Sequence, residues 1–273
     1  SQTLTLSALG KWKQGENFPE LVGHTLSQEN ALIFAVSDEE REEVYESYKN
    51  EISELISLRK KIVELGDDSV INKYEEKQQN IKTNISKRLS NVIDDEYMDA
   101  LMPGVIEISF PEVFFEENGS LKENPGFDVT IGNPPWEIWK PNSDEFFSSY
   151  EPKYRSLGTA RKKRDKQKEL MERIEGLKER WEWLDNYYKQ GSKFVRESDL
   201  YRFQSAKIDG KKTSGDINLY KTAIERNYQI LKKGGFLSYL VPSGVYTDMS
   251  ATGIRNLLID KTNIKEILGF ENK

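Results

Sequence analysis

The segment Phe127–Gly132 alternates apolar and polar residues and runs directly into Asn133-Pro134-Pro135-Trp136. Alternation with a period of two predicts a β-strand, and the glycine and prolines that follow predict its end. Two consecutive prolines fix the backbone φ angle and carry no N–H group, so the carbonyls of the turn stay free as acceptors. The sequence therefore predicts a strand that ends in a rigid loop, and this loop is a candidate active site.

The loop combines acceptor oxygens with a flat aromatic ring. Asn133 and the Pro134 carbonyl could accept both hydrogens of an exocyclic amino group in the plane of a base, while Trp136 stacks on the face of that base. These residue types fit a pocket for a flipped-out adenine. The alternative is an ordinary Asn-Pro turn after a strand. Because this run is rare by composition and follows the strand without a spacer, we favour the pocket.

The loop and its surroundings resemble the gamma-type N6-adenine DNA methyltransferases, especially the large, type IIG-like restriction-modification proteins. The first matching block comprises Phe110–Phe114 and Gly126–Trp136. The second block is similar to the helix, Gly-Gly turn and next strand of that catalytic domain, and comprises Asp216–Tyr220, Ala223–Glu225 and Leu231–Ser243. The two blocks occur in the family's order, and the likeness is weak elsewhere.

The resemblance implies the roles of the loop residues. Asn133, Pro134, Pro135 and Trp136 would form the catalytic adenine site of the NPPW motif. S-adenosylmethionine would be the methyl donor and double-stranded DNA the substrate. The adenine nitrogen would attack the sulfonium methyl in line, aimed by the two acceptors, so no carboxylate base is required.

A site for the methyl donor is not visible in the sequence. Such enzymes hold S-adenosylmethionine on a glycine-rich turn after their first strand. Residues 1–125 contain no G-x-G pattern after an apolar strand, and the chain stops at Ile267–Lys273, which reads as a strand just beginning. We therefore interpret the chain as a central catalytic segment, inactive when isolated, and leave the cofactor-binding residues unassigned. The cofactor-binding half and a target-recognition domain would lie in the remainder of the parent chain.

Composition excludes several kinds of chemistry. The chain has no Cys and a single His, His24, which argues against disulfides and against thiolate or histidine metal sites, so we expect no metal. No apolar run approaches the roughly 20 residues that cross a bilayer, and no signal pattern begins the chain. We therefore predict a cytoplasmic protein without a membrane partner. The net charge of −6 gives no global attraction to DNA.

Charge is nevertheless unevenly distributed. Residues 38–55 are acidic, whereas Lys and Arg are dense between 153 and 168. One interpretation of the basic run is a solvated helix face. The other is a phosphate-contacting clamp beside the base pocket, supported by its nearness in sequence to Trp136 and by Tyr150 and Tyr154 within it. The candidate nucleic-acid contacts are Lys153, Arg155, Arg161, Lys162, Lys163 and Arg164.

Helical periodicity occupies two parts of the chain. Apolar residues recur at three- and four-residue spacing from Glu42 to Leu65 and again from Tyr74 to Val92, with Gly66-Asp67-Asp68 between them. These two stripes predict an antiparallel helical hairpin. A further stripe from Leu170 to Tyr188 predicts a third helix with a packing role, ended by Gly191.

The remaining core is expected to be a small α/β structure. Alternating strands and helices imply a parallel sheet, here a partial Rossmann-like methyltransferase sheet interrupted by long α-helical insertions. The expected strands are Leu101–Ile108, Phe127–Ile131, Gly235–Val241, a buried one, and Ile264–Phe270. The expected helices are Leu219–Leu231 and Ile254–Leu258.

Five regions follow from these elements. Residues 1–36 would pack on the sheet edge or the helices, 37–98 would form the hairpin insertion, and 99–140 would hold the core with the NPPW loop. Residues 141–212 would form a charged helical insertion, and 213–273 the second part of the core.

Three functions remain open. We favour the central catalytic segment of a DNA adenine-N6 methyltransferase of a restriction-modification system. A protein-glutamine N5 methyltransferase uses a similar loop on a side-chain amide, but the long charged insertions and Trp136 argue against it. The third possibility is a non-catalytic helical assembly or DNA-binding module in which the pocket is vestigial.

Overall fold

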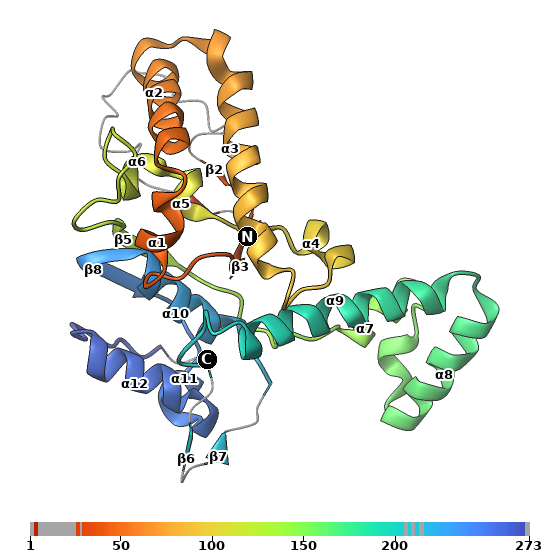
Figure 1. The fold of residues 1–273 in the computed structure, drawn as a ribbon. Coiled ribbons are helices and arrows are strands. Elements are labelled where there is room, and N and C mark those ends of the chain that lie inside the picture. The colour runs from red at the N-terminus through yellow and green to blue at the C-terminus, as the bar shows by residue number, and fades with distance from the viewer. Residues whose placement is uncertain are drawn as a thin grey trace, which may run out of the picture.

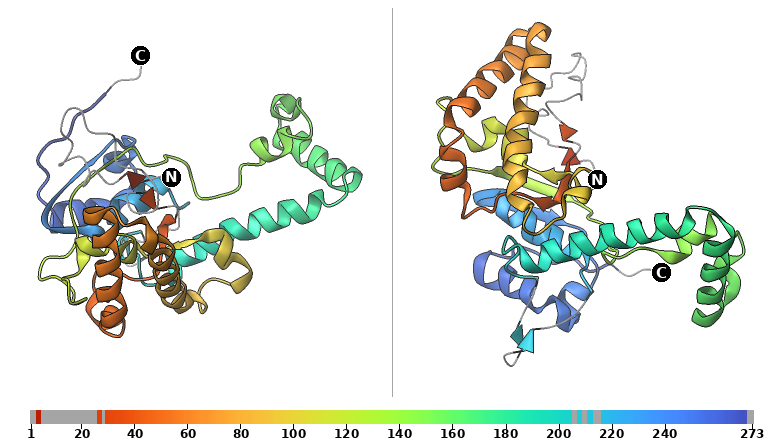
Figure 2. Two further views of the ribbon diagram at one scale, coloured as in Figure 1. Left: turned by 90° about the horizontal axis from the view of Figure 1, so that it is seen from above. Right: turned by 45° about the vertical axis from the view of Figure 1, so that its right-hand side comes forward.

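The computed structural model describes residues 3–4, 26–27, 29–204, 207–208, 211–212 and 216–270. Helices dominate this part of the chain, and the strands among them are short. A pair of long helices stands above a mixed body, and an arm projects from the body to one side (Figures 1 and 2). The architecture is mixed helix and sheet, and it contains parallel strand pairs.

The two long helices form the predicted antiparallel pair. They lie side by side and bury apolar residues between them and the body. The first ends at Gly66, which adopts the left-handed φ of 63° and donates its N–H to the Lys61 carbonyl. The elements are α1 (Arg41–Glu46), α2 (Lys49–Leu65), a 3-10 turn (Asp68–Val70), α3 (Ile71–Ser86) and a second 3-10 turn (Lys87–Leu89).

The N-terminal region reaches the centre of the body. Strand β3 (Asn30–Phe34) pairs in parallel with β4 (Pro103–Gly104) and contacts the helix α10 (Leu219–Ile230). Two short strands, β1 (Thr3–Leu4) and β2 (Leu26–Ser27), pair antiparallel. The rest of the predicted region 1–36 lies largely outside the described residues.

Of the strand predicted at Leu101–Ile108, only the two residues of β4 form a strand. The structure has α4 (Asp95–Leu101), β4, α5 (Ile106–Ser109) and α6 (Pro111–Phe114) in this part of the chain. Met102, at φ 44°, ends α4. Leu101 is the last residue of α4, Val105 precedes α5 and Ile108 lies in α5, and all three are fully buried. A short apolar run cannot separate strand from helix, and here two short helices flank a two-residue strand.

The predicted parallel α/β pairing is found in β5 (Phe127–Gly132) and β8 (Leu231–Tyr239). Val129 pairs with Phe236 and Gly132 with Tyr239, so both strands end at the same edge. Helix α10 leads directly into β8, as expected. Among the described residues the parallel sheets have two strands each, so a full Rossmann-like sheet is not seen.

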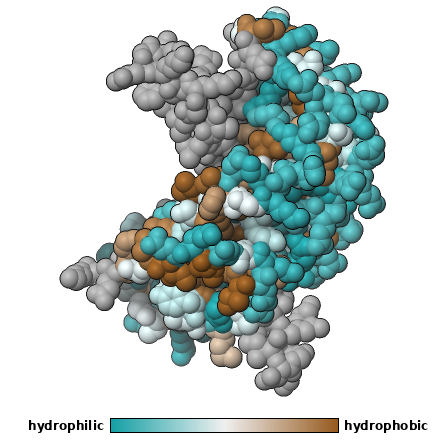
Figure 3. Space-filling view, turned by 90° about the vertical axis from the view of Figure 1, so that its left-hand side faces the viewer, coloured by the Kyte–Doolittle hydropathy of each residue, from teal (hydrophilic) through white to brown (hydrophobic). Residues whose placement is uncertain are grey.

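One face of the β5–β8 pair is open to solvent. Val129, Ile131, Phe236 and Leu240 are between 45% and 65% exposed, so the strand predicted at Gly235–Val241 forms but is not buried. Figure 3, which faces this side of the molecule, shows apolar side chains gathered on it. The strand predicted at Ile264–Phe270 is also wrong, because no partner strand among the described residues pairs with it.

Two short helices and one longer helix follow β8. Helix α12 covers the predicted segment Ile254–Leu258 and packs on α10. Its buried residues Ile254 and Leu257 join Tyr220 and Ile224 in a small cluster. The elements are α11 (Gly244–Thr247), a 3-10 turn (Met249–Ala251) and α12 (Thr252–Lys261).

The arm comprises residues 143–197 and has a small core of its own, made of Phe147, Tyr154, Leu170 and Leu177. The third helix predicted from one stripe is in fact two, because Gly176 adopts φ 72° and reverses the chain. The elements are α7 (Ser143–Ser148), a 3-10 turn (Tyr154–Leu157), α8 (Ala160–Arg173) and α9 (Leu177–Glu197), followed by the short strands β6 (Lys207–Ile208) and β7 (Lys211–Lys212).

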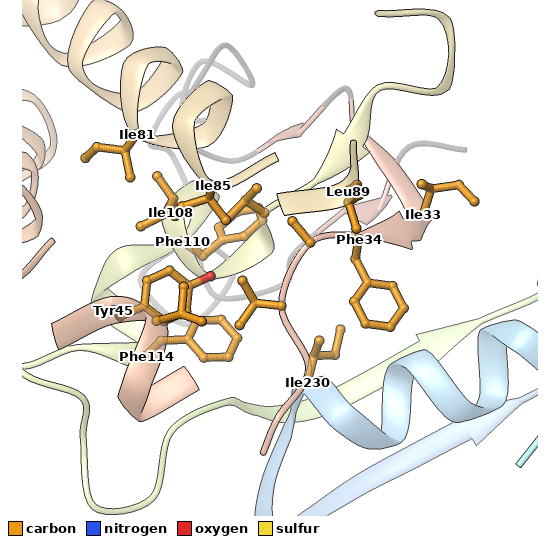
Figure 4. Packing of buried hydrophobic residues seen from close by; sticks show 14 of the residues in the cluster. Ile33, Phe34, Tyr45, Ile81, Ile85, Leu89, Ile108, Phe110, Phe114 and Ile230 are labelled. Carbon is orange, nitrogen blue, oxygen red and sulfur yellow. The ribbon is translucent and has the colours of Figure 1, made fainter. Parts of the chain in front are cut away.

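Figure 4 shows the packing of the apolar core, in which Tyr45 lies near Phe114. A buried charge cluster joins the helices within this core. Glu107 on α5 accepts from Arg41 Nε at 2.9 Å and from the Tyr45 hydroxyl at 3.1 Å. Arg226 on α10 lies 3.9 Å from the same carboxylate and over the Phe34 ring. Burial alone would raise the pKa of Glu107, but Arg41 and Arg226 lower it below its ordinary value. This cluster connects α1, α5 and α10.

Neutralising the buried carboxylate should destabilise the fold strongly. Glu107→Gln leaves two buried guanidinium groups without their counter-charge, which costs about 3–5 kcal/mol in the free energy of unfolding. Urea unfolding followed by circular dichroism measures the loss. Glu54→Gln is the matched control, because Glu54 is exposed and its partner Lys77 is also near the surface, so little change is expected. Equal losses in the two variants would contradict the role of the cluster.

The same cluster predicts a pH dependence. A carboxyl group whose pKa is lower in the folded state than in the unfolded chain stabilises the fold above the unfolded value. That stability is lost as pH falls through the folded value. The stability gap between wild type and Glu107→Gln should therefore narrow below the ordinary glutamate pKa of 4.5. Free energies of unfolding of both proteins, measured from pH 7 downward, give this difference. A difference that does not change with pH would contradict a lowered pKa for Glu107.

Candidate active site

The NPPW loop, residues 133–136, begins where β5 ends and is held by the end of β8. Leu240 donates its backbone N–H to the Gly132 carbonyl at 3.1 Å. The Leu240 carbonyl in turn accepts from Trp136 Nε1 at 3.3 Å. The two strands and the two hydrogen bonds therefore fix both ends of the loop relative to β8.

The loop presents its functional groups outward. Asn133, Pro135 and Trp136 are exposed, whereas Pro134 is buried and anchors the loop. The Trp136 side chain is 46% exposed. Within the described part of the chain, no hydrogen bond reaches the Asn133 side chain or the Pro134 carbonyl. The Asn133 side chain is therefore exposed and without a described partner beside an aromatic ring, and the Pro134 carbonyl has no described partner on a residue that is buried.

Tyr239 supports the loop from behind. A Cβ atom at Gly132 would lie 3.0 Å from the Tyr239 ring, so glycine permits this close approach. Burial raises the pKa of Tyr239 to about 12, and Asn227 on α10 hydrogen-bonds to it. Tyr239 is therefore neutral near pH 7, and its ring lies against Gly132 where the loop begins.

The chain after the loop pairs with the start of α10. Trp139 donates its backbone N–H to the Ile217 carbonyl at 2.7 Å, and Leu219 donates to the Glu137 carbonyl at 3.0 Å. Ile138 and Asn218 form an antiparallel bridge between these bonds. The pairing thus brings the two sequence blocks that carried the family resemblance next to each other.

Trp139 also fastens the base of the arm. Its Nε1 donates to the Tyr188 carbonyl at 2.9 Å, and its ring stacks on Tyr187. Gly191 lies against the same ring, where a Cβ would be 2.4 Å from ring atoms. The prediction that Gly191 ends the helix is therefore wrong. It lies inside α9, which continues to Glu197.

This contact was missed by reasoning from sequence. A glycine inside a helical pattern is costly unless something packs closely against it, and that was the available signal. The contact joins α9 to a residue three positions after Trp136. The arm and the NPPW loop are therefore held in a fixed relation.

The basic run lies on the arm and not beside the loop. The predicted residues Lys153, Arg155, Arg161, Lys162, Lys163 and Arg164 occupy the 3-10 turn, the residue before it, and the first part of α8. Helix α8 is at the far end of the arm (Figures 1 and 2). Nearness in sequence to Trp136 was misleading because the arm carries these residues away.

The tyrosines near the basic run belong to the arm's own packing. Tyr154 is fully buried, and its hydroxyl accepts from Gln167 at 2.6 Å. The Tyr150 hydroxyl accepts from Arg180 at 3.2 Å. Both tyrosines are therefore engaged in contacts within the arm.

The described residues offer no evident cofactor or metal site. They contain no group of three or more His, Cys, Asp or Glu side chains that could hold a metal ion. An open cavity of 490 Å³ lies on the arm, between Phe146 and Trp183, and one of 380 Å³ lies between α2 and α3. Neither borders Asn133. Among the described helices, none is both long and apolar enough to cross a membrane.

The model of the family described as Eco57I restriction-modification methylase matches residues 17–180 and 183–273. The chain belongs to this family. Membership indicates a DNA methyltransferase of a restriction-modification system, and for an Eco57I-family methylase the expected substrate is DNA. No curated protein and no solved structure matches the chain. In this Eco57I-family chain, the matched ranges include the NPPW loop and most of the arm.

The Trp139–Gly191 contact predicts whether Gly191→Ala stabilises or destabilises the fold. In a helix without close neighbours, Gly→Ala stabilises by roughly 1 kcal/mol. Gly191→Ala should instead destabilise, because its methyl group would overlap the Trp139 ring. Thermal unfolding of Gly191→Ala, Trp139→Leu and the double variant measures the coupling. Trp139→Leu should remove part of the destabilisation that Gly191→Ala causes, so the double variant should lose less stability than the sum of the two single variants. Losses that simply add would show that the two residues do not touch.

Proposed function

We propose that this Eco57I-family chain binds a flipped-out adenine of duplex DNA and directs its N6 atom to the methyl group of S-adenosylmethionine. The observation that carries this proposal is the NPPW loop itself. It combines the hydrogen-bond acceptors of Asn133 and Pro134, which no described residue occupies, with the exposed ring of Trp136. These are the groups that the resemblance to the gamma-type enzymes implies for the adenine site.

The chemistry of adenine explains the need for two acceptors. The N6 lone pair is delocalised into the ring, which makes the amino group a weak nucleophile. Hydrogen bonds from both N6 hydrogens to Asn133 Oδ1 and the Pro134 carbonyl would draw the nitrogen out of conjugation and aim its lone pair. Trp136 would hold the base by stacking on its face.

S-adenosylmethionine supplies an electrophilic methyl group on a sulfonium centre. Neither of the two cavities described above borders Asn133, so we assign no residue to S-adenosylmethionine binding. The loop residues act on the adenine side of the reaction. We assign cofactor binding and target recognition to other parts of the natural protein, which would act in the cytoplasm.

The family match bears on the alternatives. A glutamine amide could offer two hydrogens to the same acceptors, but the matched family is one of DNA methylases. A purely structural module would not need Asn133 exposed and free of partners. The adenine proposal uses both observations.

Removing the Asn133 acceptor should abolish methyl transfer. In the full-length protein, Asn133→Ala loses one of the two acceptors without opening a core cavity, since the side chain is exposed. Methyl incorporation into duplex DNA, followed by nucleoside analysis for N6-methyladenine, measures the effect. Asn80→Ala, an exposed asparagine on α3, is the matched control and should keep full activity. Wild-type activity in Asn133→Ala, or a product methylated on cytosine, would refute the proposal.

Two substitutions of Trp136 should separate the contribution of its ring, which would stack on the base, from that of its N–H, which bonds to the Leu240 carbonyl. Trp136→Ala removes the stacking surface, which costs roughly 1–3 kcal/mol of base binding. Trp136→Phe keeps a ring but loses the N–H that bonds to the Leu240 carbonyl, so intermediate activity is expected. Steady-state kinetics on duplex DNA should give the order wild type, Phe, Ala. Equal activity of the Phe and Ala variants would show that stacking contributes nothing.

A further inference from the structure

Positive charge is concentrated at the far end of the arm. Residues 153–168 contain eight Lys or Arg residues and one acidic residue, Asp165, in a chain whose net charge is −6. An acidic protein has no overall attraction to a polyanion, so any such attraction must come from a local surface. The far end of the arm is such a surface.

Several of these cations form no ion pair with a carboxylate of the described residues, although Arg164 Nε donates to the Ala160 carbonyl of its own helix at 3.4 Å. Lys163 pairs with Asp144 at 2.6 Å, and Lys166 pairs with Glu169 at 2.5 Å. By contrast, Arg161, Arg164 and Lys168 are exposed, and no carboxylate of the described chain pairs with them. Steps of three and four place these three on one stripe of α8. We call this stripe the basic stripe.

The arm can hold the basic stripe in a defined place. Its small core keeps α7, α8 and the start of α9 folded together. The Thr159 hydroxyl caps α8 by accepting from the Lys162 N–H. At the other end, α9 is fastened by the Trp139 contact, next to the NPPW loop. The stripe is thus connected to the candidate active site through α9 and Trp139.

The dimensions fit a duplex. From Gly191 to Leu177, α9 spans about 20 Å at 1.5 Å per residue, and α8 packs at its far end. A turn of B-DNA is about 34 Å long, with roughly one phosphate charge per 1.7 Å of axis. A contact at this distance would fall on backbone phosphates well away from the target base.

We propose that the basic stripe of the arm, Arg161, Arg164 and Lys168, binds the phosphate backbone of duplex DNA more than half a helical turn from the adenine held at the NPPW loop. This inference rests on the proposed function for its choice of substrate. The arm then sets the position of the duplex relative to Asn133 through the Trp139 contact. Lys163, although part of the predicted set, is assigned to the arm's own structure by its pairing with Asp144.

The test is the salt dependence of DNA binding by the full-length protein. The variant changes Arg161, Arg164 and Lys168 together to Glu. Fluorescence anisotropy with a duplex about three helical turns long should show weaker binding, with the slope of log affinity against log salt reduced by about two to three units. The matched control changes the exposed lysines Lys61, Lys73 and Lys87 of the helical hairpin to Glu, which alters net charge equally.

Duplex length locates the contact. On a duplex shorter than about half a turn on each side of the methylated adenine, wild type and arm variant should bind alike, because the stripe then finds no phosphates. A variant that matches the control on the long duplex would overturn the proposal. So would a loss of equal size on both duplexes, which would place the stripe at the base itself.

The outcome for the arm is distinguishable from the outcome for the loop. If wild type binds DNA but methylates an atom other than adenine N6, the proposed function fails while the salt slope still tests the stripe. If Asn133→Ala loses methylation yet binds DNA with the wild-type salt slope, loop and arm act separately as proposed. Circular dichroism of the arm variant confirms folding, since all three side chains are exposed.

Discussion

The body of the molecule is organised around one buried carboxylate. Glu107 is 1% exposed and meets Arg41 and Arg226, which come from helices far apart in the sequence. A buried charge costs several kcal/mol unless it is paired, so these helices can pack only where the three groups meet. Because α10 runs directly into β8, the position of Arg226 also sets the position of the strand that holds the NPPW loop.

The elements that could be predicted are those whose signal is local. Alternation and a proline turn predicted β5 and its loop, and helical periodicity with Gly66 predicted α2 and α3. The failures involve information that is not local. Leu101–Ile108 is short enough to fit either period, and its inward-facing Glu107 has partners 66 and 119 positions away. Whether Gly235–Val241 is covered likewise depends on packing that the segment itself does not encode.

The candidate site shows the same division. Asn133 and Trp136 could be predicted as candidate site residues because the motif that indicates them consists of adjacent residues. The groups that hold them were not, since the Leu240 carbonyl is a backbone atom of another strand and Tyr239 acts through its contact with Gly132. The basic run was found, but its distance from the loop depends on the length and direction of α9, which periodicity alone did not give.

The way the arm is attached also has an evolutionary consequence. Its far end has a separate small core, so substitutions there can accumulate without disturbing the body. Positions 139 and 191 have no such freedom, because the ring of one fills the space that a side chain at the other would need. Among relatives that carry this arm, a larger residue at 191 should occur together with a smaller one at 139. The far end of the arm can thus vary in sequence, whereas positions 139 and 191 are expected to change together.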